Sequence, residues 1–176
     1  MTTIVSFVGR SKSGKTTLLE TVISELKSMG YRVGVIKHTP HGFDIDPDGK
    51  DTSRFSTAGA DMVASIGPNR ISFIEDVSEE PYLDRIRDIF EKKVDIILTE
   101  GYKTSTTAKI IVVRNGNKIE RSNYNGQILT VVFSRLSTER TPVFSPEDIC
   151  DVVNLIVHLI EKQISLREML IGHATS

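Results

Sequence analysis

The stretch GRSKSGKT, residues 9–16, determines how the rest of the chain is interpreted. It fits the phosphate-binding P-loop pattern, also called Walker A, of Gly, four residues and Gly-Lys-Ser/Thr. An apolar run precedes it at residues 3–8, and residues 15–29 follow with apolar side chains at helical spacing. A strand, a glycine-rich turn and a helix in this order direct backbone N–H groups at a phosphate. The stretch therefore predicts a site for a nucleoside triphosphate.

The residue types of this loop suit that role. Gly9 and Gly14 allow tight backbone turns. Lys15 can reach the β and γ phosphate oxygens, and the Thr16 hydroxyl can bind Mg²⁺. The residues predicted to bind nucleotide here are Gly9, Ser11, Lys12, Ser13, Gly14, Lys15, Thr16 and Thr17.

A P-loop also needs an acidic residue near the metal, at the end of a neighbouring strand. Asp95 and Glu100 lie at the start and the end of the apolar run DIILTE. A strand of this length is about 16 Å long, so the two carboxylates cannot share one Mg²⁺. We expect Glu100 to be the metal-binding or water-orienting acid and Asp95 to lie at the opposite edge. Gly101 would let its N–H approach the γ-phosphate, and Lys103 either contacts an anion or is solvated.

The remainder of the chain alternates between strands and helices. Strands are predicted at residues 32–37, 94–101, 109–113 and 128–134, and residues 61–66 and 70–75 flank GPN as a hairpin. Helices are predicted at residues 78–93, with Ser78 as N-cap, and from Ser145 onward. The turn signal Asn115-Gly116 predicts a second hairpin with residues 118–121 as its returning strand. The fold class is α/β, a three-layer P-loop NTPase fold with a mostly parallel sheet and a β-hairpin extension, in one domain of residues 1–176.

Composition narrows the possible partners. With 22 basic and 23 acidic residues the net charge is −1, which does not favour nucleic acid or a membrane surface as a partner. The first residues lack a signal-peptide pattern, so a cytoplasmic location is expected. The one cysteine, Cys150, is predicted to be a small core residue of the last helix.

The polar segment HTPHGFDIDPDGKDTSRF, residues 38–55, is too long for a simple connection. It is interpreted as a switch that senses the γ-phosphate, with Asp46 or Asp51 holding a water on the metal. The alternative is a solvated loop in which Asp51 caps a short helix. A transition-metal site at His38 and His41 is disfavoured because no third ligand is evident.

Four motifs in this order resemble the molybdopterin-guanine dinucleotide biosynthesis protein B (MobB) family: GRSKSGKTT, GVIKHTPHGFDID, GKDTSRFSTAGA and ILTEGYK. The resemblance covers residues 3–134. It implies GTP and Mg²⁺ as ligands and a weak GTPase activity. It further implies a homodimer that assists a molybdopterin guanylyltransferase in attaching GMP to molybdopterin, so molybdopterin or its guanine dinucleotide becomes an expected partner.

The matching motifs assign further residues. Glu100, Gly101 and Lys103 match the family's Glu-Gly-aromatic-Lys element, and residues 50–52 and 58–60 match two others, which adds Lys50 and Asp51 as nucleotide-binding residues. The sequence departs from the family at Asp48, where a proline is usual, and at Arg135, where an aspartate is expected after Ser134. If that aspartate recognises guanine in the family, this sequence lacks the residue for that contact at position 135.

Two further features stay open. NKIE, residues 117–120, approximates the guanine-reading Asn-Lys-x-Asp element, although a hairpin explains it better. Arg10 is either a solvated side chain or an arginine finger that acts on a partner subunit's nucleotide, which would make Lys15, Glu100 and Arg10 the catalytic residues. The alternative functions are a small-molecule kinase using ATP or GTP, and a non-catalytic nucleotide-dependent adaptor.

Overall fold

The computed structural model describes residues 1–40, 42, 51–138 and 141–174. The chain divides into two compact units, residues 1–38 with 87–176 and residues 39–86, which are described separately. The prediction of one domain therefore stays a prediction. None of the described helices combines the length and the apolar composition that a membrane crossing requires.

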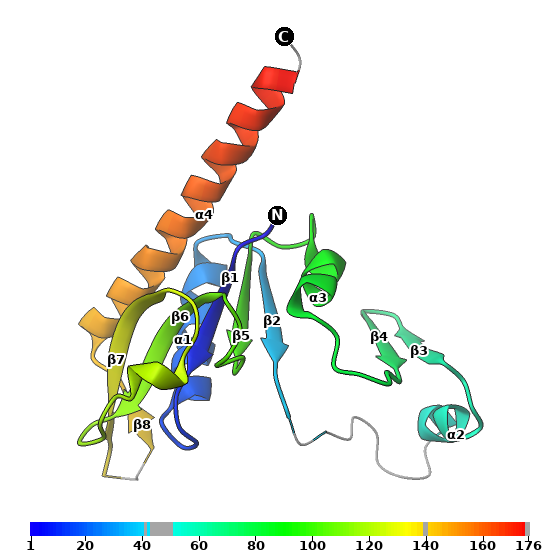
Figure 1. Cartoon of the computed structure of the whole chain (residues 1–176), viewed down its shortest axis with the longest axis horizontal. Helices are drawn as coiled ribbons and strands as arrows, with labels where there is room; N and C mark the ends of the chain where they lie inside the picture. The colour runs from blue at the N-terminus through cyan, green and yellow to red at the C-terminus, as the bar shows by residue number, and fades with distance from the viewer. Residues whose placement is uncertain (41, 43–50, 139–140, 175–176) are drawn as a thin grey trace. The chain divides into compact units, whose positions relative to one another are not determined.

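The first unit is built on a six-stranded sheet (Figure 1). Its strand order is β2-β5-β1-β6-β7-β8, and every pair is parallel except β7 with β8. The strands are β1 (Ile4–Val8), β2 (Val33–Lys37), β5 (Ile96–Glu100), β6 (Ala108–Arg114), β7 (Ile128–Leu136) and β8 (Pro142–Val143). The mostly parallel α/β sheet predicted from the apolar runs is confirmed. Residues 9–16, which match the P-loop pattern and are called the P-loop below, follow the central strand β1.

Two helices cover one face of this sheet, namely α1 (Lys15–Ser28) and α4 (Pro146–Ala174). Val5 and Phe7 of β1 point into this main core, where Leu18 and Leu26 of α1 and Ile156 of α4 are fully buried with them. The opposite face carries a smaller cluster around Val8, Ile111 and Val113, which is covered by the chain around a 3₁₀ turn, η1 (Arg121–Asn123). Alternate residues of β1 thus enter opposite layers, as strand geometry requires.

The second unit contains α2 (Asp51–Thr57) and the antiparallel hairpin β3 (Met62–Gly67) with β4 (Arg70–Glu75). The hairpin was predicted, and the short helix belonged to the alternative interpretation in which Asp51 caps it. Alternation divides the hairpin into two faces. Val63 and Ile74 lie on the more buried face, whereas Ile66 and Phe73, on the other face, are 80% and 61% exposed.

Three sequence predictions are wrong. Helix α3 (Leu83–Phe90) begins after Pro81 rather than at Ser78, because a proline disfavours helical backbone at the residue before it. Residues 118–121 form no strand: Asn115-Gly116 does make a turn, but β6 then pairs in parallel with β7. Cys150 is exposed, because α4 presents Val152, Val153 and Ile156 to the core.

Candidate functional site

The P-loop is held in shape by close packing at its two glycines. A Cβ on Gly9 would lie 2.2 Å from the backbone oxygen of Val112 in β6. Gly14 caps α1 with φ +95°, and a Cβ there would lie 2.8 Å from the Cβ of Pro142. Both positions therefore require glycine, and the loop packs closely against β6 and β8.

The P-loop lysine folds back over the loop. The Nζ of Lys15 donates a hydrogen bond to the backbone oxygen of Arg10 at 2.9 Å. Burial lowers the pKa of Lys15; nearby Glu100 opposes this shift and Lys103 adds to it. A bound phosphate would stabilise the charged form of Lys15, because it supplies a negative charge to an ammonium that is desolvated and close to the Lys103 ammonium.

The predicted metal-binding pair comes together. The Oγ1 of Thr16 donates a hydrogen bond to Oε2 of Glu100 at 2.9 Å, although the two residues are 84 positions apart. The parallel pairing of β1 with β5 brings them together, because Phe7 and Glu100 are register partners. An alcohol oxygen beside a carboxylate at the carboxyl edge of the sheet is a donor set that suits Mg²⁺.

Asp95 lies at the other end of β5. Its Oδ1 is 2.6 Å from an Arg32 guanidinium nitrogen, and the backbone N–H of Arg32 donates to its Oδ2 at 2.7 Å. The hydrogen bond and charge of Arg32 hold the pKa of Asp95 below its ordinary value despite partial burial. The structure thus separates Asp95 from the P-loop, as expected, and gives it an ion-pairing role.

The residues after Glu100 are tightly arranged. Gly101 has φ +108°, and its N–H donates to the Phe7 oxygen at 3.0 Å. A Cβ on Gly101 would lie 3.0 Å from the Cβ of His38, whose ring stacks on Tyr102 with centroids 4.4 Å apart. The end of β2 and the residues after β5 therefore pack together beside the P-loop.

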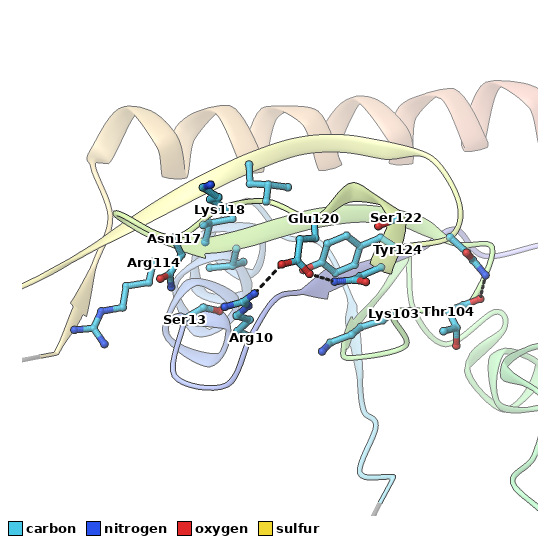
Figure 2. Close-up of a pocket in the computed structure, with 15 residues that line it drawn as sticks. Arg10, Ser13, Lys103, Thr104, Arg114, Asn117, Lys118, Glu120, Ser122 and Tyr124 are labelled. Atoms are coloured by element: carbon cyan, nitrogen blue, oxygen red, sulfur yellow. Dashed lines mark hydrogen bonds and ion pairs between the residues drawn. The ribbon is translucent and has the colours of Figure 1, made fainter.

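Arg10, Ser13 and Lys103 line a cavity of about 440 Å³ together with the segment after β6 (Figure 2). We call it the Glu120 pocket and define it by Arg10, Ser13, Lys103, Asn117, Glu120 and Tyr124. Arg10 donates to Oε1 of Glu120 at 3.1 Å, and the Asn123 amide donates to its Oε2 at 2.8 Å. Burial raises the pKa of Tyr124, which keeps its hydroxyl neutral.

A second cavity of about 470 Å³ lies beyond β7, lined in part by Asn115, Arg135, Phe144 and Asp148. It adjoins the P-loop, because the Phe144 ring would also contact a Cβ on Gly14, at 3.0 Å. The backbone oxygen of Ser13 accepts a hydrogen bond from the buried Ser134 hydroxyl at 2.7 Å. Arg135, where this sequence differs from the family pattern, therefore lies close to the candidate site.

A network of buried hydroxyl groups and one lysine lies behind the site, in the middle of the sheet. Lys109 is fully buried, and its Nζ, with three N–H donors, lies 2.6–2.9 Å from four acceptor oxygens of Ser105 and Thr107. Ser6 and Thr99 join the network through hydroxyl contacts of 2.7 and 2.8 Å. Desolvation lowers the pKa of Lys109 to about 8. Sequence reasoning missed this network, for which the only signal is a lysine within an apolar run.

The other predicted residues are distributed as follows. Ser11 and Lys12 are exposed, Lys12 with φ +61°, and Thr17 is half-buried in α1. Asp51 is the first residue of α2 in the second unit, exposed and 3.7 Å from Arg54. Asp46, Lys50 and His41 lie outside the described residues, so the switch interpretation and the disfavoured histidine site stay predictions. Among the described residues, no cluster of three or more His, Cys, Asp or Glu side chains could hold a metal.

Comparison with known proteins adds to this geometry. Residues 4–134 match the model of a family described as molybdopterin guanine dinucleotide synthesis protein B. The molybdopterin-guanine dinucleotide biosynthesis adapter protein of Escherichia coli is 36% identical over 119 residues, 66% of this chain and 68% of the relative. The protein of the same name from Haemophilus influenzae is 36% identical over 112 residues, and the match spans 63% of each chain.

Solved structures agree with the fold. A crystal structure of molybdopterin-guanine biosynthesis protein B is similar with a TM-score of 0.69 and 30% identity, covering 90% of this chain and 99% of that one. The crystal structure of Bacillus subtilis MobB gives a TM-score of 0.65 and 25% identity, covering 87% and 97% of the two chains.

Proposed function

Because the chain belongs to the molybdopterin guanine dinucleotide synthesis protein B family, we propose that it binds GTP with Mg²⁺ at the P-loop and hydrolyses it slowly. In this proposal it is an accessory factor in the synthesis of molybdopterin guanine dinucleotide, and it assists a guanylyltransferase. Relatives named adapter proteins support a role in which binding to a partner, rather than turnover, is the output.

The contact between Thr16 and Glu100 is the observation that carries the proposal. A P-loop threonine beside a carboxylate at the end of the adjacent parallel strand suits Mg²⁺ bound to a triphosphate. Gly9 and Gly14 fit the same role, because each leaves no room for a side chain where backbone N–H groups must reach phosphate.

The roles of the residues follow from where they lie. Thr16 and Glu100 would hold Mg²⁺, which neutralises charge on the β and γ phosphate oxygens when bound. Lys15 would donate to a phosphate oxygen instead of to the backbone oxygen of Arg10. The negative charge of the phosphate would offset the cost of burying the Lys15 ammonium. In the alternative role, Glu100 would orient the attacking water.

The proposal includes a homodimer. Met62, Ile66, Ile71 and Phe73 share one face of the hairpin and are 53–80% exposed. A two-stranded hairpin is marginal alone, and an apolar face of this kind marks an association surface. A second copy of the chain, which the family resemblance implies, is the expected partner for this face. Light scattering of the wild type and of Phe73→Ser would test it: a monomeric wild type would contradict the homodimer.

Titration calorimetry tests the nucleotide assignment. GTP, GDP and ATP are titrated with Mg²⁺ into the wild type, into Lys15→Ala and into Lys92→Ala as a matched surface control. We expect GTP to bind best, Lys15→Ala to lose binding, and Lys92→Ala to retain it. Equal affinity for ATP and GTP would contradict the guanine assignment, and binding that survives in Lys15→Ala would contradict the P-loop assignment.

A further inference from the structure

The Glu120 pocket is a cavity lined mainly by polar and charged residues next to the P-loop, and the proposed function assigns no ligand to it. Its volume of about 440 Å³ suits a small heterocyclic ligand. Arg10 and Ser13 belong to the P-loop, whereas Asn117, Glu120 and Tyr124 come from the segment after β6. Figure 2 shows Arg10, Lys103, Glu120 and Tyr124 gathered in one region of the cavity.

The charges of this pocket favour an anion. Arg10, Lys103, Arg114 and Lys118 line it, against the single carboxylate of Glu120. Lys103 also lowers the pKa of Lys15, so the electrostatic influence of the pocket extends to the place where phosphates bind. A phosphate monoester is the ligand group that such a cation excess binds well.

The carboxylate favours a particular heterocycle edge. Each Glu120 oxygen accepts one hydrogen bond, from Arg10 or from Asn123, and a carboxylate oxygen has a second acceptor site. A ring N–H next to an exocyclic amino group would fill both remaining sites at once. This pair of donors belongs to a 2-amino-4-oxopyrimidine ring, which guanine and pterins both contain. We call the side of the ring that carries the two donors the 2-amino-4-oxo edge.

The walls supply further complementary groups. Tyr124 presents a neutral aromatic ring for stacking, and Asn117 presents a side-chain amide. The Ser13 Oγ is buried, lines the pocket and finds no hydrogen-bond partner among the described residues. A buried hydroxyl without a partner is costly, and a polar ligand atom would relieve this cost.

We propose that the Glu120 pocket binds a second ligand beside the P-loop nucleotide, namely a phosphate monoester of a heterocycle with the 2-amino-4-oxo edge. Glu120, paired with Arg10, holds the edge, and Lys103 holds the phosphate. Only the simultaneous occupancy rests on the proposed function, which puts a nucleotide at the P-loop; the binding of the second ligand to the pocket does not. A pterin monophosphate and GMP both have this chemistry.

The test uses the full chain saturated with a non-hydrolysable GTP analogue and Mg²⁺. A pterin monophosphate, GMP and AMP are titrated separately, with Glu120→Gln and the exposed-site control Glu161→Gln in parallel. We expect one equivalent of pterin monophosphate or GMP to bind without displacing the analogue. Glu120→Gln should weaken this binding about tenfold or more, since one acceptor becomes a donor. The tighter binder of the two, pterin monophosphate or GMP, identifies the class of heterocycle that the pocket recognises.

Three results would overturn the inference. The first is displacement of the analogue by the added ligand, which would make the pocket the base site of the P-loop nucleotide. The second is AMP binding as tightly as GMP, because AMP lacks the edge. The third is equal affinity in Glu120→Gln and Glu161→Gln. Repeating the titration with Lys15→Ala separates the two proposals: there the P-loop is disabled, and the second ligand should still bind.

Discussion

The buried Lys109 predicts an unusual dependence of stability on pH. Its pKa of about 8 in the folded protein lies below the ordinary value of 10.5, because burial disfavours the ammonium. Between these two values the unfolded chain binds more protons than the folded chain, so stability rises with pH. The cost is fully present below pH 8 and disappears above the unfolded pKa.

The magnitude follows from the shift. A difference of about 2.5 pH units corresponds to about 3.4 kcal/mol in total. Only part of this is gained in the experimentally accessible range, about 2 kcal/mol between pH 7 and pH 9.5 by the linkage relation. The oxygens that accept hydrogen bonds from the ammonium stabilise its charged form and oppose the shift, so this figure is an upper bound.

The measurement is urea unfolding at half-unit steps from pH 7 to pH 9.5, for the wild type and Lys109→Met. The methionine keeps the length of the side chain and removes the charge. The wild-type free energy of unfolding minus that of the variant should rise by up to about 2 kcal/mol across this range. Groups that titrate equally in both proteins, including Lys15, cancel in the difference. A flat or falling difference would refute the reasoning.

Three further predictions concern the P-loop. Glu100→Gln should weaken Mg²⁺-dependent GTP binding by about tenfold or more, whereas Asp95→Asn should leave it unchanged. Titrations of GTP with Mg²⁺ and with EDTA measure this, and equal losses in the two variants would contradict the choice of Glu100 as the acid. Gly14→Ala should lower the free energy of unfolding by about 1–3 kcal/mol, since its φ is positive and its Cβ would contact Pro142; an unchanged urea midpoint would contradict this. If Arg10 acts across a dimer, a mixture of Arg10→Ala and Lys15→Ala chains should recover GTP hydrolysis that neither has alone, and no recovery would limit Arg10 to its own chain.

Much of the fold could be predicted because its signals are local. The strands β1, β5 and β7 are near-continuous apolar runs, and α1 has both helical periodicity and a glycine after its end. The hairpin β3–β4 surrounds a short turn signal. Such features depend on a few neighbouring residues, which a sequence displays directly.

The errors arise where contacts between distant parts of the chain determine the local structure. Residues 118–121 were predicted to be a returning strand, but β7 pairs with the edge of β6, and Lys118, Ile119 and Glu120 line a pocket instead. Cys150 fits a helical pattern equally well on either face, and only the packing of α4 on α1 selects the other one. The contact of Thr16 with Glu100 was expected because parallel strands end at one edge.

The packing of Gly9 against Val112 also sets an order of events during synthesis. β1 is the first strand to be made, yet both of its partners, β5 and β6, lie about a hundred residues later in the chain. The P-loop is wedged against a β6 backbone oxygen, so it takes its final shape only after the ribosome has added Val112. The amino-terminal segment therefore cannot complete this loop by itself while it is being synthesised. The conformation of the loop depends on contacts that are distant in sequence, and such contacts form late in folding.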